Sequence, residues 1–439
     1  MGVKVAKFGG SSVADAIQLA KVKSIVEGDP ERKYVVVSAP GKRFSGDSKI
    51  TDLLYLCKTH IDHNVAYDQV FQVVCDRYRA IELNLGVNVG LEEEFRIIDE
   101  NLQKGASADY IASRGEYLTA KLTAAYLGLE FVDTAGLVQF DKHGKFLNEE
   151  TNRALKEALA GVDGAVLPGF YGSVPDGSIK TFSRGGSDIT GALVARAVEA
   201  DIYENWTDVS GFLMADPRVV KDPIPIEIIT YVELRELSYM GAGVLHEDAI
   251  YPARAGNIPI NIRNTNDPQH PGTIIVGDID EPAGKSKVIT GIAGHKDFTV
   301  ISIYKNMMSG EAGFVRRILS VLEDYGVVVE HLPSGIDTLS VVLANKNLNG
   351  KLEEITEEIR RRLQPDRMEV FENMALIATV GRGMARRMGV SATLFTALYN
   401  AGVNIRMIDQ GSSEMNIIVG VENSDFEKAV RAIYEAFVE

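Results

Sequence analysis

Short apolar segments alternate with amphipathic segments of helical length over residues 1–275, and this alternation limits the fold more than any other feature of the chain. Continuous apolar runs such as residues 34–38 and 164–167 are typical of strands buried on both faces of a parallel sheet. Helical periodicity occurs at residues 13–26, 92–102, 116–126 and 189–198, and in a stretch within 51–83. The pattern predicts an α/β fold with an open, mostly parallel sheet between helix layers, in which ligands bind beyond the carboxyl ends of the strands.

Size and charge narrow the classes of function. The 439 residues suffice for about two to four domains. A net charge of −15 argues against nucleic acid and against an anionic membrane as partners. Cys57 and Cys75 make neither a disulfide framework nor a metal cluster, so no residue is assigned to a metal. We see no signal peptide, myristoylation motif or membrane-spanning run, and expect a cytoplasmic protein.

A polar stretch with proline and glycine at residues 278–285 indicates a linker, and the pattern changes beyond it. Two successive units have the order strand, helix, strand, strand, helix, which predicts two ferredoxin-like βαββαβ units. Their predicted strands are residues 298–304, 327–329, 339–343, 375–380, 403–408 and 415–421, and their helices are 314–325, 352–363, 391–400 and 426–437. The second unit lacks a last strand, so we expect residues 288–292 to complete its sheet and to interleave the two units. The predicted domains are 1–280, 288–370 and 371–439.

The first predicted strand leads to Lys7 and to a glycine pair, Gly9 and Gly10, followed by helical sequence. Glycines let the backbone turn sharply and approach a ligand, and the unpaired N–H groups of a helix start suit a phosphate. Lys7 adds a cation for the same anion. The stretch matches neither the P-loop nor the dinucleotide pattern, so an ordinary connection with Ser12 and Asp15 as a helix cap remains an alternative.

Further polar segments could join this one at the carboxyl ends of the strands. They are a predicted helix start at 113–116, a second glycine pair within 183–188, and residues 206–218. Two glycine pairs at helix starts, each with a cation, indicate two anionic groups held face to face, as phosphoryl transfer requires. Arg184 can hold a carboxylate through two hydrogen bonds, and Asp188 can orient Lys7. The alternative is ordinary α/β loops in which Arg184 and Asp188 form only a surface pair.

Taken together, these segments resemble those of the aspartokinases, a group within the amino-acid kinase family. The matching stretches are KFGGSS (7–12), SAPGK…ITDLL (38–54), SRGEYL (113–118), SRGGSD (183–188), WTDVSGFLMADPRVV (206–220), ELSYMGAGVLH (236–246) and INIRNTNDPQHPGTII (260–275). The C-terminal repeat resembles tandem ACT domains, which are small amino-acid-sensing modules. The resemblance therefore implies an amino-acid kinase fold followed by two ACT units.

The resemblance also implies a reaction. The β-carboxylate of L-aspartate would attack ATP, which carries Mg²⁺, to give 4-phospho-L-aspartate and ADP at the start of lysine, threonine and methionine biosynthesis. The implied catalytic residues are Lys7, which would neutralise the γ-phosphate, and Asp188, which would organise the centre. Aspartate would be bound through its α-carboxylate by Arg184, through its amino group by Glu116, and by a hydrogen bond from Thr51. The implied nucleotide-binding residues are Gly9, Gly10, Thr207, Asp208, Leu213 and Arg218.

Two positions depart from the pattern of the family. Some aspartokinases carry a nucleotide-contacting tyrosine where this chain has Leu213, and a lysine where it has Gly243. The nucleotide contacts at both positions are therefore open. Lys221 is a candidate for the missing cation.

An amino-acid effector site is implied in the first ACT unit, where a loop before a helix faces a strand end of a partner subunit. The implied residues are Met308, Gly313, Phe314, Val329, Glu330, Ser334 and Asp337. The acidic residues Glu330 and Asp337 suit a cationic effector, so lysine is expected first and threonine second. The alternative is a loop that merely caps its helix. ACT sheets pair edge to edge in such proteins, so a homodimer or a dimer of dimers is expected.

Three other functions compete with an aspartate kinase. The tandem ACT units argue against a sister kinase that acts on glutamate or N-acetylglutamate. The joint presence of Lys7, Arg184 and Asp188 argues against a non-catalytic amino-acid sensor with an inactive kinase domain. A dehydrogenase is disfavoured because Arg386 stands at the third glycine position of the dinucleotide pattern that begins at Gly381.

Overall fold

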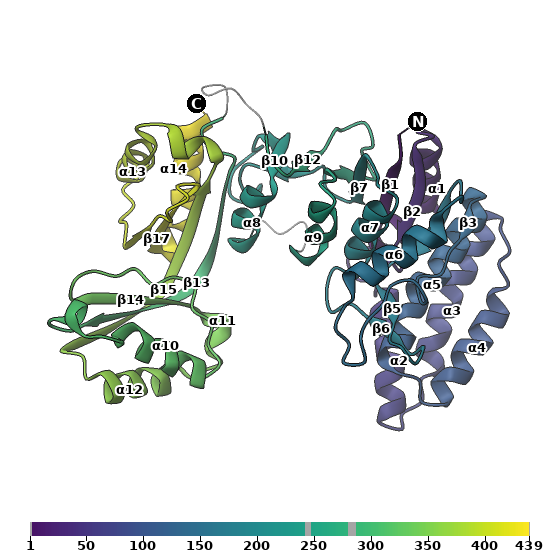
Figure 1. The fold of residues 1–439 in the computed structure, drawn as a ribbon, viewed down its shortest axis with the longest axis horizontal. Helices are drawn as coiled ribbons and strands as arrows, with labels where there is room; N and C mark the ends of the chain where they lie inside the picture. The colour runs from purple at the N-terminus through teal and green to yellow at the C-terminus, as the bar shows by residue number, and fades with distance from the viewer. Residues whose placement is uncertain (1, 242–246, 280–286, 439) are drawn as a thin grey trace. The chain divides into compact units, whose positions relative to one another are not determined.

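The computed structural model describes residues 2–241, 247–279 and 287–438 (Figure 1). The chain divides into two compact units: Met1–Phe212, Pro225–Tyr231 and Val244–Ile279 form the first, and Leu213–Ile224, Val232–Gly243 and Asp280–Glu439 form the second. The domain boundaries proposed from the sequence stay predictions, and the predicted linker lies largely outside the described residues. Of the helices in the described part of the chain, none combines the length and apolarity that a membrane crossing requires.

An eight-stranded sheet with the order β10-β12-β11-β7-β1-β2-β4-β3 forms the centre of the first unit. All neighbours are parallel except β11 and β12, so the predicted open, mostly parallel α/β sheet is confirmed. Its strands are β1 (Lys4–Phe8), β2 (Arg32–Val37), β3 (Glu130–Phe131), β4 (Ala165–Pro168), β7 (Ile202–Thr207), β10 (Ile228–Thr230), β11 (Ile260–Asn264) and β12 (Thr273–Val276). Four short strands lie outside this sheet: β5 (Tyr171–Ser173), β6 (Ile179–Thr181), β8 (Phe212–Leu213) and β9 (Pro225–Ile226).

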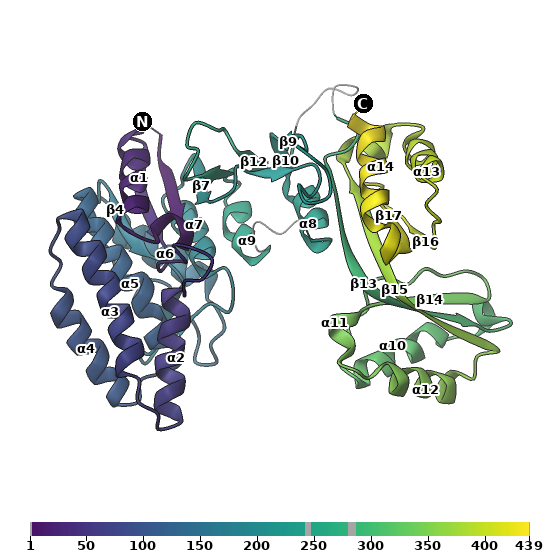
Figure 2. The same ribbon diagram turned by 180° about the vertical axis from the view of Figure 1, so that it is seen from behind.

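Helices cover both faces of this sheet. Helices α1 and α5 lie against one face, with α2, α3 and α4 packed beside them as Figure 2 shows, and α7 lies against the other face with α6 and α9. The bounds are α1 (Ala16–Glu27), α2 (Ile50–Asp62), α3 (Asp68–Leu85), α4 (Leu91–Gln103), α5 (Ala108–Leu127), α6 (Asn148–Leu159), α7 (Gly186–Ala197) and α9 (Glu247–Ala255). Phe8 and Trp206 belong to the core on the α1 side. Because side chains alternate along a strand, Lys7 and Asn205 face α7.

The second unit contains a five-stranded antiparallel sheet with the order β14-β13-β15-β17-β16. Its strands are β13 (Gly291–Tyr304), β14 (Thr338–Ala344), β15 (Arg367–Val380), β16 (Met407–Asp409) and β17 (Asn416–Glu422). Its helices are α8 (Tyr231–Tyr239), α10 (Phe314–Asp324), α11 (Asn345–Leu348), α12 (Leu352–Leu363), α13 (Val390–Asn400) and α14 (Phe426–Val438). The residues of α8 from Val232 onward belong to this unit. Helices α10 and α12 enclose one apolar core with β13 and β14, and α13 packs on α14.

The five-stranded sheet has two lobes, one that contains β14 and one that contains β17 and β16. Strands β13 and β15 run through both lobes. The second half of β13, from Phe298 to Tyr304, pairs with β14 and with the first half of β15. The first half of β13 pairs with the second half of β15, which in turn pairs with β17. Of the segment 288–292, which we expected in the sheet of the second lobe, Gly291 and Ile292 lie in β13 opposite Val380 and Thr379.

Two predicted strands of the repeat differ from the structure. Residues 327–329 form no strand, and isolated bridges join His331 to Val342 and Ser334 to Leu339 instead. Pro333 between these bridges has no N–H group with which to continue a ladder. The strand predicted at 403–408 is reduced to the three residues of β16.

Gly294 in β13 provides a test of how tightly the second unit is packed. A Cβ atom there would lie 2.5 Å from the backbone oxygen of Leu376 and 2.8 Å from the ring of Phe426. We expect Gly294→Ala to lower the free energy of unfolding by about 1–3 kcal/mol, because the strand pair or α14 must shift. Urea unfolding of the full chain measures the effect. Gly310→Ala is the matched control, since a Cβ at Gly310 meets no atom within 4 Å. Equal midpoints for the two variants would contradict this account.

Candidate active site

Lys7 and Asp188 meet at the carboxyl end of β1. The Lys7 ammonium lies 2.5 Å from Oδ1 of Asp188, which stands in the first turn of α7. Asn205 joins them: its Nδ2 donates to the same oxygen at 3.0 Å, and its Oδ1 lies 3.5 Å from Nζ of Lys7. Asn205 was not among the site residues predicted from the sequence. The pairing register of the two strands would have identified it, because Asn205 stands opposite Lys7 in the parallel pair of β7 and β1.

The glycine pair next to Lys7 touches the loop that follows β2. The N–H of Gly9 donates to Trp206 O at 3.0 Å, and Gly10 O accepts from the N–H of Gly41 at 2.8 Å. A Cβ on Gly10 would lie 2.9 Å from Ala39 O, and one on Gly41 would lie 2.7 Å from the carbonyl carbon of Gly10. The two loops therefore approach as closely as glycine allows.

A 3-10 turn, Gly10–Val13, begins at the second glycine of the pair, where the sequence predicted an immediate α-helix. Helix α1 begins only at Ala16, because Asp15 caps it by accepting from the Gln18 N–H. Ser12, which was expected in the cap, instead places its hydroxyl 2.7 Å from that of Thr265.

Glu116 lies in the middle of α5, so the prediction of a helix start at 113–116 is wrong. The helix begins at Ala108, because the Ser107 side chain caps it by accepting from the Tyr110 N–H. Glu116 is buried, and its Oε2 has no hydrogen-bond partner among the described residues. Burial raises the pKa of Glu116 to about 8, although the backbone N–H of Ala39 opposes the shift. A Cβ on the neighbouring Gly115 would lie 2.8 Å from Cβ of Ala39, so the loop after β2 packs directly on this turn.

Thr51 and Arg184 lie near the starts of two helices of the first unit, α2 and α7. Thr51 is half-buried in the first turn of α2, which is tied to the loop after β2 by the Ile50 N–H donating to Pro40 O at 3.1 Å. Arg184 is exposed just before α7 and forms no ion pair with another residue that the structure describes. Its guanidinium is thus accessible to an anion.

The predicted nucleotide-binding residues divide between the two units. Thr207 ends β7 and donates to the exposed Asp208 at 3.2 Å, whereas Leu213 and Arg218 belong to the second unit. The Arg218 side chain is 86% exposed and pairs with Asp216 at 2.5 Å. Lys221 is exposed, and Gly243 lies outside the described residues.

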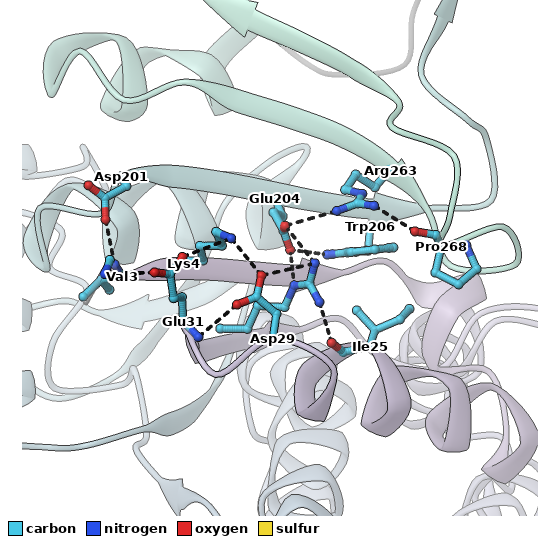
Figure 3. Close-up of polar contacts among 12 residues, drawn as sticks. Val3, Lys4, Ile25, Asp29, Glu31, Asp201, Glu204, Trp206, Arg263 and Pro268 are labelled. Carbon is cyan, nitrogen blue, oxygen red and sulfur yellow. Dashed lines mark hydrogen bonds and ion pairs between the residues drawn. The ribbon is translucent and has the colours of Figure 1, made fainter.

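A buried ion network holds the strand that leads to Thr207 (Figure 3). The Glu204 carboxylate accepts from Nε of Arg32 at 2.7 Å and from the Trp206 indole at 2.9 Å, and it lies 3.4 Å from Nη1 of Arg263. The two guanidinium groups also lie over the Trp206 ring, at 5.3 and 4.6 Å from its centroid. These donors offset the cost of burying the carboxylate, and together they fix β7 just before the site.

Four of the predicted effector residues gather around the loop before α10. Met308 and Phe314 are buried, and Gly313 caps α10 at a φ of +80°. The backbone N–H of Lys305 donates to Asp337 O at 2.9 Å, which ties this loop to the one before β14. One carboxylate oxygen of Asp337 is buried without a partner in the described part of the chain.

Glu330 has different surroundings from Asp337. It accepts a hydrogen bond from the hydroxyl of Tyr239 in α8 and lines a cavity of about 200 Å³ together with Tyr239, His295 and Lys346. Val329 is half-buried and Ser334 is exposed. Of the two acidic groups, Asp337 is the one with a buried oxygen that has no partner among the described residues.

Comparisons with known proteins agree with this architecture. The Amino acid kinase family profile matches residues 2–264, and an ACT domain profile matches residues 377–437. Aspartokinase 3 of Bacillus subtilis is 39% identical over 451 residues, covering 99% of this chain and 98% of the relative. The crystal structure of Clostridium acetobutylicum aspartate kinase is 52% identical with a TM-score of 0.93, and E. coli aspartokinase III, solved with aspartate and ADP, is 25% identical with a TM-score of 0.76; both cover 100% of each chain.

The chain therefore belongs to the amino acid kinase family. Within that family it is one of the aspartate kinases, and it carries a C-terminal ACT domain. The resemblance found in the sequence is confirmed.

Glu116 should make the stability of the protein depend on pH. Its pKa is about 8 in the folded chain against 4.5 ordinarily, so the folded state holds an extra proton between these values. Stability therefore falls as the pH rises from about 4.5 to 8, by at most about 1.4 kcal/mol per pH unit. We expect Glu116→Gln to flatten this slope in urea unfolding without substrate. Glu130→Gln, at an exposed position, is the control. A variant slope equal to that of the parent would contradict the assignment.

Proposed function

We propose that this aspartate kinase transfers the γ-phosphoryl group of ATP to the β-carboxylate of L-aspartate, which gives 4-phospho-L-aspartate and ADP. The observation that carries the proposal is the group of Lys7, Asp188 and Asn205 beside a glycine loop, at the carboxyl ends of the central strands β1 and β7. Phosphoryl transfer depends mainly on positioning and on cations around the transferred group. Mg²⁺ would arrive with the phosphates of ATP, as it commonly does.

Each residue has a role that follows from its surroundings. Lys7 would neutralise charge on the γ-phosphate, and Asp188 and Asn205 would hold its ammonium in place. Gly9 and Gly10 would contact the phosphates, and the missing Cβ of Gly10 lets the loop after β2 pack against this turn. Thr207 and Asp208 would contact the nucleotide at the end of β7, and the contacts expected of Leu213 and Arg218 stay predictions from the sequence.

The aspartate side of the site is expected to recognise a zwitterion with an extra carboxylate. The buried oxygen of Glu116 that lacks a partner in the described part of the chain suits the substrate ammonium, which would supply the missing counter-charge. Arg184 would take the α-carboxylate through its planar fork, and Thr51 would add a hydrogen bond. The β-carboxylate needs no general base, because its pKa of about 4 leaves it ionised near neutral pH.

Removing the Lys7 ammonium tests the phosphoryl-transfer site. We expect Lys7→Met to lower kcat by about 100-fold or more, the cost typical of losing one preorganised group that stabilises transition-state charge. The measurement is coupled ADP release with ATP, Mg²⁺ and L-aspartate, and with glutamate or N-acetylglutamate in its place. Lys4→Met is the matched control, since Lys4 lies on the same strand and pairs with Asp29 and Glu31. Unchanged turnover would remove Lys7 from the mechanism, and turnover with glutamate alone would disprove the aspartate assignment.

We also propose that the ACT domains bind an end-product amino acid, lysine first and threonine second, and so regulate the first step of that biosynthesis. One buried oxygen of Asp337, beside the Met308 loop, has no partner within the described ranges, and this supports a cationic effector. Inhibition follows only if lysine binds an inactive arrangement more tightly than an active one. We further propose that the protein forms a homodimer or a dimer of dimers through its ACT sheets, and that it acts in the cytoplasm. The buried free thiols of Cys57 and Cys75 are compatible with a reducing compartment.

A dose series of lysine, threonine and methionine, singly and in pairs, identifies the effector. We expect Asp337→Asn to raise the lysine concentration for half-inhibition by about 10-fold or more, as for the loss of a charged hydrogen bond. Glu323→Gln, an exposed change of the same charge on α10, should leave that concentration as it is in the parent. Equal lysine sensitivity in the parent and in the Asp337 variant would contradict this role.

A further inference from the structure

Arg77 on α3 connects two loops of the first unit through three of their backbone carbonyls. Its side chain is buried, with only 5% of its surface exposed. Nη1 donates to Ser48 O at 2.9 Å, and Nη2 donates to Ala14 O at 3.1 Å and also to Gly41 O. One planar group thus spans the turn that begins at Gly10 and both the first and the last part of the loop 38–49, which joins β2 to α2.

These segments carry both halves of the proposed site. Ala14 closes the turn that follows Gly9 and Gly10, on the phosphate side. Ser48 lies three residues before Thr51, on the aspartate side, and Gly41 touches Gly10 between them. Of the backbone hydrogen bonds described above, the one from Gly41 to Gly10 links the two loops, and the one from Ile50 to Pro40 joins the start of α2 to the beginning of the loop 38–49. The guanidinium adds contacts to both loops at once.

The geometry needs arginine and could not be made by lysine. A guanidinium presents five N–H donors in a rigid plane, whereas an ammonium is a single point on a flexible stem. Asp47 supplies the counter-charge, at 3.0 Å from Nη1. Arg43 in turn holds Asp47 through its backbone N–H and its guanidinium, at 2.8 to 3.0 Å. The Arg77 charge is therefore compensated inside the loop that it binds.

The next residue of α3 reaches the turn that carries Glu116. The hydroxyl of the buried Tyr78 donates to Gly115 O at 2.7 Å. Consecutive residues of one helix therefore contact the phosphate-side turn, the aspartate-side loop and the turn of α5 next to Glu116. A rigid helix is better suited than a loop to keep such segments in fixed positions.

We propose that Arg77 is a positioning residue for phosphoryl transfer, which holds the glycine loop and the aspartate-binding loops at the separation that the reaction needs. The inference rests on the proposed function. It assigns to Arg77 no contact with either substrate. Its loss should therefore lower the rate of the chemical step far more than the binding of ATP or aspartate, since a misplacement of about 1 Å can cost about 100-fold in rate.

The test compares Arg77→Lys with the parent enzyme as full chains, using steady-state kinetics with ATP, Mg²⁺ and L-aspartate and calorimetric titration of ADP. We expect kcat to fall by about 10- to 100-fold, while both KM values and the ADP dissociation constant stay within about 3-fold. Arg79→Lys is the matched control, since Arg79 lies on the same helix, is partly exposed and pairs with Glu92 and Asp76. It should behave as the parent does.

Unchanged kcat in a folded Arg77→Lys enzyme overturns the proposal, as does a loss confined to KM or to ADP binding. If that variant does not fold, Asp47→Asn decides: a fall in kcat with KM unchanged supports the proposal, and parent-like kcat overturns it. Failure of the proposed function is distinguishable, because the parent and the Arg79 variant would then show no turnover of aspartate.

Discussion

The first unit depends on one buried charge pair at the end of its central strand. Lys7 has little access to water, and the Asp188 carboxylate at 2.5 Å compensates its charge. Such a pair offsets the desolvation of its members only where geometry is good and further hydrogen bonds satisfy them. Asn205 supplies one of these bonds from the neighbouring strand, and α7 supplies the carboxylate. The register of β1 with β7 and the position of α7 must therefore both be correct before this group of Lys7, Asp188 and Asn205 can form.

Much of this arrangement could be predicted from the sequence because its signals are local. Continuous apolar runs gave the parallel strands, and the glycine pairs marked the two loops beside Lys7 and Asp188. Asn205 and Arg77 could not be found in this way, because their roles arise from register and from contacts with segments distant in the chain. A polar residue inside an apolar run looks the same whether it faces a site or satisfies the backbone.

The errors have physical causes as well. Ser107 caps α5 two turns earlier than the polar residues at 113–116 suggested, because local polarity does not separate a helix start from a buried polar turn. The valines at 327–329 have the composition of a strand, and Val327 is buried, but the chain beyond them makes only isolated bridges. Composition identifies a buried segment, whereas pairing decides whether that segment is a strand.

Strands β13 and β15 have a consequence for how the second unit can change over evolutionary time. Each supplies one half of its length to each lobe of the sheet. No point between the lobes exists at which a cut would leave two intact sheets. Deletion or exchange of one lobe would take with it the central strands of the other, so the two lobes can be gained, lost or transplanted only as a single block.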